Sequence, residues 1–123
     1  EKALEYYNQV LFIRDEVGDR SGQAVTLNNL GLVHDKLGQQ EKAVALYNQA
    51  LLIQEEIGDQ SGEATTLFNL AMVLRDQDRL EVAVARLKQV VSLESLIKNP
   101  NLESDTTLLA QFEAELAAKK EEE

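Results

Sequence analysis

Few side chains in this sequence of 123 residues could carry out chemistry. His34 is the single histidine and there is no cysteine, so neither a cysteine nucleophile nor a thiolate metal site can be built. A catalytic or metal-binding histidine needs further ligands or a catalytic partner, and His34 falls on the apolar stripe of a helical segment. We therefore predict that His34 is a core residue in the place of an aromatic side chain; the alternative is a ligand-binding or pH-sensing role.

Carboxylates are plentiful, but their spacing marks no catalytic or metal site. Asp76-x-Asp78 resembles the start of a calcium loop, yet the glycine and the distal glutamate of such a loop are missing, so we predict a helix end there. The glycines are isolated and form no phosphate-binding loop. The sequence predicts a protein that is not an enzyme, with no catalytic residue, no metal and no cofactor.

Charge and hydropathy narrow the partners. Twelve Lys and Arg against 22 Asp and Glu give a net charge of -10, which disfavours nucleic acid and anionic membrane surfaces. No apolar run reaches the roughly 18 residues of a spanning helix, and the charged first residues do not resemble a signal peptide. We expect a cytoplasmic protein whose partners are other proteins.

A repeat organises the elements that must position any site. Residues 1–40 and 41–80 are identical at 19 of 40 aligned positions, and a third, decayed copy begins at Glu81. Apolar residues recur at spacings of three and four, which predicts helices over 1–17, 20–37, 40–57, 60–77, 80–97 and 100–119. Connections of two or three residues make neighbouring helices antiparallel.

The helix ends have recognisable signals. Gly18 and Gly58 are placed to close a helix in the left-handed conformation, and Asp19 and Asp59 to cap the helix that follows. The position in register with these aspartates is Asn99, which predicts an N-cap with Pro100 as the first helical residue.

Small residues recur where helices must approach closely. Gly31 and Ala71 occupy one such position and Ala43 and Ala83 another. Since one helix pair cannot bury its apolar face alone, the pairs must stack. The prediction is a single all-α domain over residues 1–123, an α-solenoid of antiparallel helix pairs.

The residues that carry a family resemblance are Leu27-Asn28-Asn29-Leu30-Gly31, Gly38, Ala43, Leu46-Tyr47 and Ala50-Leu51. With these the chain resembles the tetratricopeptide repeat (TPR) family. The 40-residue period is similar to that of the long-helix subset in kinesin light chains, Leu-Gly-Asn spindle adaptors and bacterial signalling arrays. The resemblance implies a scaffold that binds proteins.

The register of the 40-residue repeat divides the chain into a truncated repeat, two full repeats, a capping helix and a tail. Residues 1–17 align with the second helix of a pair, so we expect a truncated repeat there and a fragment of a larger adaptor or signalling protein. Full repeats at 20–57 and 60–97 precede a capping helix at 100–119 and an acidic tail at 120–123. In the capping helix we expect Thr106, Leu109, Phe112 and Leu116 to face the last pair, and Asp105 and Glu115 to face water.

In this family the first helices of the pairs line a concave groove. Asn29 and Asn69 are in register, and an amide offers a donor and an acceptor to a peptide backbone, as in the family's asparagine ladder; the alternative is hydrogen bonding within the stack. Phe68 and Met72 suggest a pocket for one side chain, or else burial against the next helix. The candidate peptide-binding residues are Asn28, Asn29, Leu32, Lys36, Phe68, Asn69, Met72 and Arg75.

The predicted function is therefore a non-catalytic scaffold that binds a peptide or partner domain in this groove. The alternative is a structural module that forms homo-oligomers through an apolar face of the first helix. The candidate self-association residues are Tyr6, Tyr7, Val10 and Leu11.

Overall fold

The computed structural model describes residues 2–16 and 18–122; residues 1, 17 and 123, which the predicted first helix and tail include, lie outside the described residues. All regular structure in the described ranges is helical, as predicted. The helices are α1 (Lys2–Glu16), α2 (Arg20–Lys36), α3 (Gln40–Ile57), α4 (Gln60–Asp76), α5 (Leu80–Ile97) and α6 (Leu102–Glu122).

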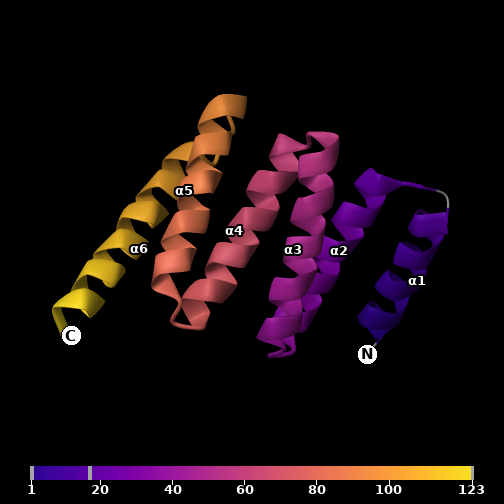
Figure 1. Ribbon diagram of the computed structural model, residues 1–123, viewed down its shortest axis with the longest axis horizontal. Coiled ribbons are helices and arrows are strands. Elements are labelled where there is room, and N and C mark those ends of the chain that lie inside the picture. Colours follow the sequence, from indigo (N-terminus) through magenta and orange to yellow (C-terminus); the bar gives the residue numbers. More distant parts are fainter. Residues whose placement is uncertain (1, 17, 123) are drawn as a thin grey trace.

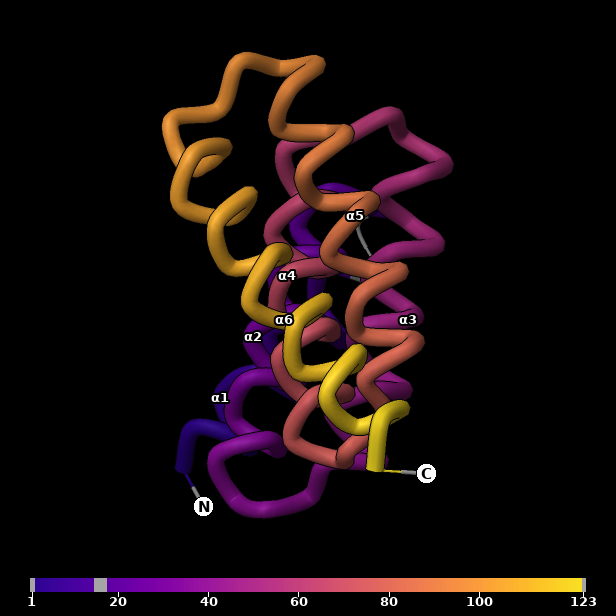
Figure 2. Tube along the Cα trace, turned by 90° about the vertical axis from the view of Figure 1, so that its left-hand side faces the viewer, coloured from indigo at the N-terminus to yellow at the C-terminus, as the bar shows by residue number. Residues whose placement is uncertain are grey.

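The helices stand side by side in chain order, from α1 at one end of the row to α6 at the other (Figure 1). Each packs on its neighbour in sequence, and α2 also lies against α4. Seen along the row, α2 and α4 lie on one side and α3 and α5 on the other (Figure 2). This is the predicted solenoid, in which α2–α3 and α4–α5 are the complete pairs.

The junctions before α2 and α4 end and begin helices as predicted. Gly18 and Gly58 both adopt φ 71°, the left-handed region that glycine enters without strain. Asp19 and Asp59 then accept hydrogen bonds from the backbone N–H groups of Gly22 and Gly62, each at 2.9 Å. These bonds satisfy backbone donors that the first turn of a helix leaves unpaired.

The predicted start of α6 at Pro100 is wrong. Residues 99–102 form a β-turn closed by a bond from Leu102 N–H to Asn99 O at 3.1 Å, with Pro100 at the turn position that its fixed φ favours. Asn99 Oδ1 accepts from the N–H of Asn101 within this turn and does not cap the helix. Consequently α6 begins two residues late, at Leu102, and it continues through residues 120–122 of the predicted tail.

The core runs between the layers in two clusters. The larger joins α3, α4, α5 and α6 around Tyr47, Leu87 and Phe112, each 0% exposed, and the smaller joins α2 and α3. The small residues have the predicted role: Ala43, Ala71 and Ala83 are fully buried. A Cβ on Gly31 would lie 2.5 Å from Cε1 of Tyr47, so only glycine fits there without a shift.

The inward face of α6 differs from the prediction. Phe112 is fully buried, and Leu109 and Leu116 pack against the larger cluster, as predicted. Thr106 is exposed instead of buried, and Asp105 is 9% exposed instead of facing water. Asp105 lies four residues before Leu109 and seven before Phe112, which places it on the same inward side of α6, while Thr106 is one residue off that side.

Candidate protein-binding groove

His34, Asp76 and Asp78, which the sequence analysis considered for ligand or metal binding, all lie at or near helix ends. His34 is half-buried near the end of α2, where Oε1 of Gln39 accepts a hydrogen bond from its Nδ1, so the prediction of a core imidazole is wrong. His34 lies outside both buried clusters, whereas Leu74 at the equivalent position of α4 is 2% exposed within the larger one. Asp76 is the last residue of α4 and Asp78 lies in the turn beyond it, which confirms a helix end.

α2 and α4 lie on the same side of the row (Figure 2), and we use the term groove face for six half-buried residues of these two helices: Asn28, Asn29, Leu32, Phe68, Asn69 and Met72. Its two helices are joined by a hydrogen bond in which Nδ2 of Asn69 donates to Oδ1 of Asn28 over 3.1 Å. The residue that Asn69 contacts is Asn28, which directly precedes Asn29, the residue in register with Asn69. Part of the Asn69 amide is used within the stack, which was the alternative left open by the sequence.

The paired amides keep hydrogen-bonding capacity. After the bond is made, Asn28 retains both of its N–H donors, and the oxygen of Asn69 retains its acceptor sites. Both side chains are half-buried, as is Asn29 on the next position of α2. The groove face thus presents a donor and an acceptor beside each other at the junction of two helices.

Apolar side chains flank these amides. Leu32, Phe68 and Met72 are half-buried and pack against the larger core cluster with part of each side chain. Phe68 and Met72 are thus partly buried against the core, which was one of the two alternatives, and the pocket for a ligand side chain stays a prediction.

Arg75 is held by α6. Its Nε and Nη2 donate to the carboxylate of Glu115 at 3.0 and 2.7 Å, and its guanidinium lies 5.0 Å from the ring centroid of Phe112. The hydrogen bonds and charge of Glu115 raise the pKa of Arg75. Glu115 was expected to face water, and its role here was missed because no local spacing links it to Arg75.

The margin of the groove face is acidic. Burial raises the pKa of Asp35, and the nearby charge of Asp76 raises it further. Lys36 is exposed in the last turn of α2. This margin favours a partner that brings positive charge.

The four self-association residues of α1 are not equally available. Tyr6 is 63% exposed and its ring meets that of Tyr7 edge-on, with centroids 5.6 Å apart. Tyr7 and Val10 are half-buried, and Leu11 packs against the smaller core cluster.

The prediction missed two exposed residues of α1, Phe12 and Ile13, which are 64% and 59% exposed. For Ile13, comparison of the two repeats indicates the exposed face. Ile53, in register with Ile13, is only 6% exposed in α3. A face that is covered in α3 is thus open in α1.

The sequence analysis also missed a cleft of about 520 Å³ on the side of the molecule formed by α1 and α3. Phe12 and Leu52 lie at its rim in register with each other, and Leu27 of α2 lies between the two helices that flank it. The other lining residues are Asn8, Leu11, Arg20, Gln23, Gln49 and Ile53.

Residues 2–16 and 18–122 contain no group of three or more His, Cys, Asp or Glu residues arranged to hold a metal ion. None of the helices in these ranges has the length and apolar content that a bilayer crossing requires.

Comparison with known proteins agrees with this architecture. The family model described as tetratricopeptide repeat matches residues 1–56 and again residues 43–93. No curated protein matches the chain. The two family matches together cover residues 1–93, which include α2–α3, α4 and most of α5, so the chain belongs to the tetratricopeptide repeat family.

Proposed function

We propose that this protein is a non-catalytic scaffold whose groove face binds an extended peptide segment of a partner protein. Tetratricopeptide repeats generally mediate protein–protein interaction, and the family is typically non-catalytic. The observation that carries the finer proposal is the Asn69–Asn28 amide pair, which leaves one donor side and one acceptor side free between α2 and α4. A peptide bond needs that combination.

The remaining groove-face residues define what the peptide would look like. Phe68, Met72 and Leu32 offer a partly apolar floor for one side chain, and the acidic margin at Asp35 and Asp76 favours Lys or Arg nearby. The net charge of -10 acts in the same direction at long range. The proposed ligand is therefore an extended peptide with one large apolar residue and flanking basic residues.

The expected affinity is modest. Only a few hydrogen bonds and one buried side chain are available to offset the cost of association, so we expect a dissociation constant in the micromolar range or weaker.

The test is selection from a displayed library of linear peptides, followed by calorimetric titration of the selected peptide. The double variant Asn28→Ala, Asn69→Ala should weaken binding by about tenfold, which corresponds to one or two lost hydrogen bonds. Asn29→Ala alone tests the ladder predicted by register. Asn48→Ala, an exposed asparagine on α3, is the matched control and should bind as the wild type does. Equal affinity of the double variant and the wild type would remove the groove face as the binding site.

A second candidate function is self-association through α1. The observation that favours it is the open face around Tyr6 and Ile13, since the residue equivalent to Ile13 is buried in α3. Sedimentation across a concentration series should give a dimer whose population falls in Tyr6→Gln, Ile13→Gln. The self-association residues Tyr7, Val10 and Leu11 would support that face from beneath. A wild-type monomer at the highest concentration would contradict this function.

A further inference from the structure

The three junctions α1–α2, α3–α4 and α5–α6 place one residue in the same structural position. The backbone N–H of Asp19 donates to Arg14 O at 2.8 Å, that of Asp59 to Gln54 O at 2.9 Å, and that of Asn99 to Glu94 O at 2.9 Å. Arg14, Gln54 and Glu94 are therefore equivalent, each in the last turns of the helix that precedes a junction. Along the chain this position is basic, then neutral, then acidic.

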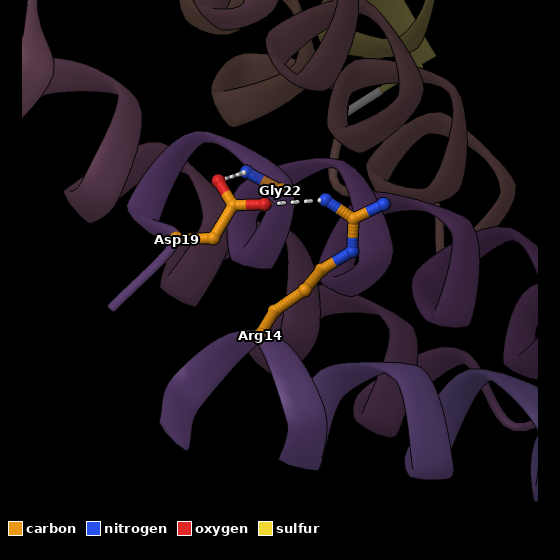
Figure 3. Close-up of polar contacts among 3 residues, drawn as sticks. All are labelled: Arg14, Asp19 and Gly22. Carbon is orange, nitrogen blue, oxygen red and sulfur yellow. Dashed lines mark hydrogen bonds and ion pairs between the residues drawn. The ribbon is translucent and has the colours of Figure 1, made fainter. Parts of the chain in front are cut away.

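The first junction is an ion pair. Figure 3 shows Asp19 between two donors: Oδ1 accepts from the backbone N–H of Gly22 and Oδ2 from Nη1 of Arg14, the latter at 2.8 Å. A Cβ on Gly22 would lie 1.6 Å from Nη1 of Arg14, so glycine makes room for the guanidinium. Here a positive side chain meets the acid of the junction.

The second junction has no side-chain charge at the equivalent position. Gln54 is 3% exposed, and its Nε2 lies where a Cβ on Gly62 would approach to 2.9 Å. The neutral amide occupies the space above the start of α4 while Asp59 caps the helix.

The third junction places two acids together. Glu94 is 3% exposed and Asp105, in the first turn of α6, is 9% exposed, and their side chains are hydrogen-bonded. A carboxylate can only accept, so one of the two carboxyl groups must carry the proton of this bond. Burial, followed by the hydrogen bond and charge of Asp105, raises the pKa of Glu94 from 4.5 to about 7, which assigns the proton to Glu94.

The cleft beside this pair contributes no basic side chain. A cleft of about 290 Å³ opens onto the pair, lined by residues of α4, α5, α6 and the turn between the last two. Glu94 and Asp105 are the titratable residues of this lining; the others are Ala64, Thr65, Phe68, Asn99, Asn101 and Ser104. The second oxygen of Glu94, Oε1, is buried and has no hydrogen-bond partner among the described residues. Ionised Glu94 would thus face Asp105 with one oxygen unsolvated.

We propose that Glu94 and Asp105 form a proton-dependent latch that fastens the first turns of α6 to α5. With the proton the pair is a hydrogen bond, and without it the pair is two buried carboxylates that repel each other. Beyond this pair α6 is anchored by Leu108 and Leu109, which pack against the larger core cluster, and further along by Phe112, the Arg75–Glu115 pair and the Lys119–Asp78 pair at 2.8 Å. Loss of the proton should therefore loosen the start of α6 and leave its second half docked. The latch does not depend on the proposed groove function.

The sign of the pH effect follows from the direction of the shift. The folded chain holds the proton of Glu94 more tightly than the unfolded chain does, so the stabilisation is complete below pH 4.5 and is lost as the pH rises through about 7. Between pH 5 and pH 8 the latch should change the equilibrium constant for opening of α6 by about a hundredfold.

The experiment is amide hydrogen exchange across α6 in the whole chain at pH 5 and pH 8, corrected for intrinsic exchange rates. Wild-type protection at residues 105–107, the first amides of α6 with backbone acceptors, should fall about a hundredfold more than in Glu94→Gln, which copies the neutral second junction. Glu103→Gln, which changes an exposed acid in the same first turn of α6 as Asp105, is the matched control and should show the wild-type pH dependence. The same loss of protection in wild type and Glu94→Gln would overturn the latch.

Two further measurements test the latch if Glu94→Gln folds poorly. A carbon NMR titration of the Glu94 carboxyl in the wild type should have its midpoint near pH 7, and a midpoint near 4.5 would overturn the latch. Addition of Ca²⁺ or Mg²⁺ at pH 8 should not restore protection. Restoration that requires Glu94 would show that the pair binds a metal ion instead, and would also overturn the proposal.

Discussion

The two complete helix pairs, α2–α3 and α4–α5, solve one packing problem in two ways. In α2–α3 the crossing is filled by Tyr47 against Gly31, and in α4–α5 the equivalent positions hold Leu87 against Ala71. Tyr47 and Leu87 are both 0% exposed. The large ring of Tyr47 opposite Gly31 fills the same space as the smaller Leu87 opposite the methyl group of Ala71. The summed side-chain volume at the crossing is therefore conserved between the two pairs, although the volume at each position is not.

The largest effect is expected when the two solutions are mixed. Gly31→Ala keeps Tyr47 and adds a Cβ that would meet three ring atoms within 2.9 Å. Alanine is the better helix former by about 1 kcal/mol, but overpacking costs about 1–3 kcal/mol, so we expect a net loss of up to about 2 kcal/mol. Urea unfolding of wild type and variant measures it.

The rescue of this loss tests its cause. Gly31→Ala with Tyr47→Leu reproduces the Ala71–Leu87 combination and should be more stable than the sum of the single changes predicts, with a coupling of about 0.5–3 kcal/mol. The reciprocal control is Ala71→Gly with Leu87→Tyr. Additive effects in both cycles would mean that the two crossings are not equivalent.

The positions of these small residues could be predicted from the sequence, while lateral contacts could not. Gly31 and Ala71 stand in register within a 40-residue repeat, and the repeat also located the helix ends at Gly18, Asp19, Gly58 and Asp59. The repeat fixes what is equivalent along the chain. It does not fix how far one helix slides past the next, because that depends on the packing of the whole crossing.

The groove face and α6 illustrate this limit. Asn69 meets Asn28 and not Asn29, a stagger of one residue between α2 and α4. Asp105 lies on the side of α6 that also carries Leu109, Phe112 and Leu116, and it is 9% exposed. The spacing along α6 is consistent with this inward position, but the pairing of Asp105 with Glu94 depends on how α6 packs against α5.

A smaller effect distinguishes how the two pairs begin. Asp59→Ala removes the cap of α4 and should cost about 1 kcal/mol. Asp19→Ala removes the equivalent cap of α2 together with the ion pair to Arg14, whose partly exposed charges add up to about 1 kcal/mol. Urea unfolding in low salt should therefore show a larger loss for Asp19→Ala, and the difference should shrink in 1 M salt. An unchanged difference at high salt would contradict an electrostatic origin.

The second helices of the two pairs, α3 and α5, are closed by different residue types. Gly58 closes α3 at φ 71°, whereas Lys98 closes α5 at φ 55°, where a Cβ is strained. Lys98→Gly should relieve that strain and stabilise the protein by about 0.5–1 kcal/mol in thermal or urea unfolding. Gly58→Lys is the reciprocal control and should destabilise it. A loss of stability in Lys98→Gly would mean that the lysine side chain contributes more than its backbone strain costs.

The smallest effect at neutral pH concerns the hydroxyl group of Tyr47, which is present at the α2–α3 crossing and has no counterpart at the α4–α5 crossing. The hydroxyl of Tyr47 is buried without a hydrogen-bond partner among the described residues, and Leu87 has no such group. Tyr47→Phe keeps the ring against Gly31 and removes the unsatisfied oxygen, so we expect the free energy of unfolding to stay equal or rise by up to about 1 kcal/mol at pH 7.

Burial, with the charge of Asp35 as a second cause, also raises the pKa of Tyr47. The folded chain therefore resists ionisation of Tyr47, and wild-type stability should fall as the pH rises above 10 while Tyr47→Phe is spared this loss. Urea unfolding at pH 7 and above pH 10, with Tyr6→Phe as the exposed control, measures the difference. A gap between Tyr47→Phe and wild type that does not widen above pH 10 would mean that the hydroxyl reaches water, and the crossing of α2 and α3 would then be looser than that of α4 and α5.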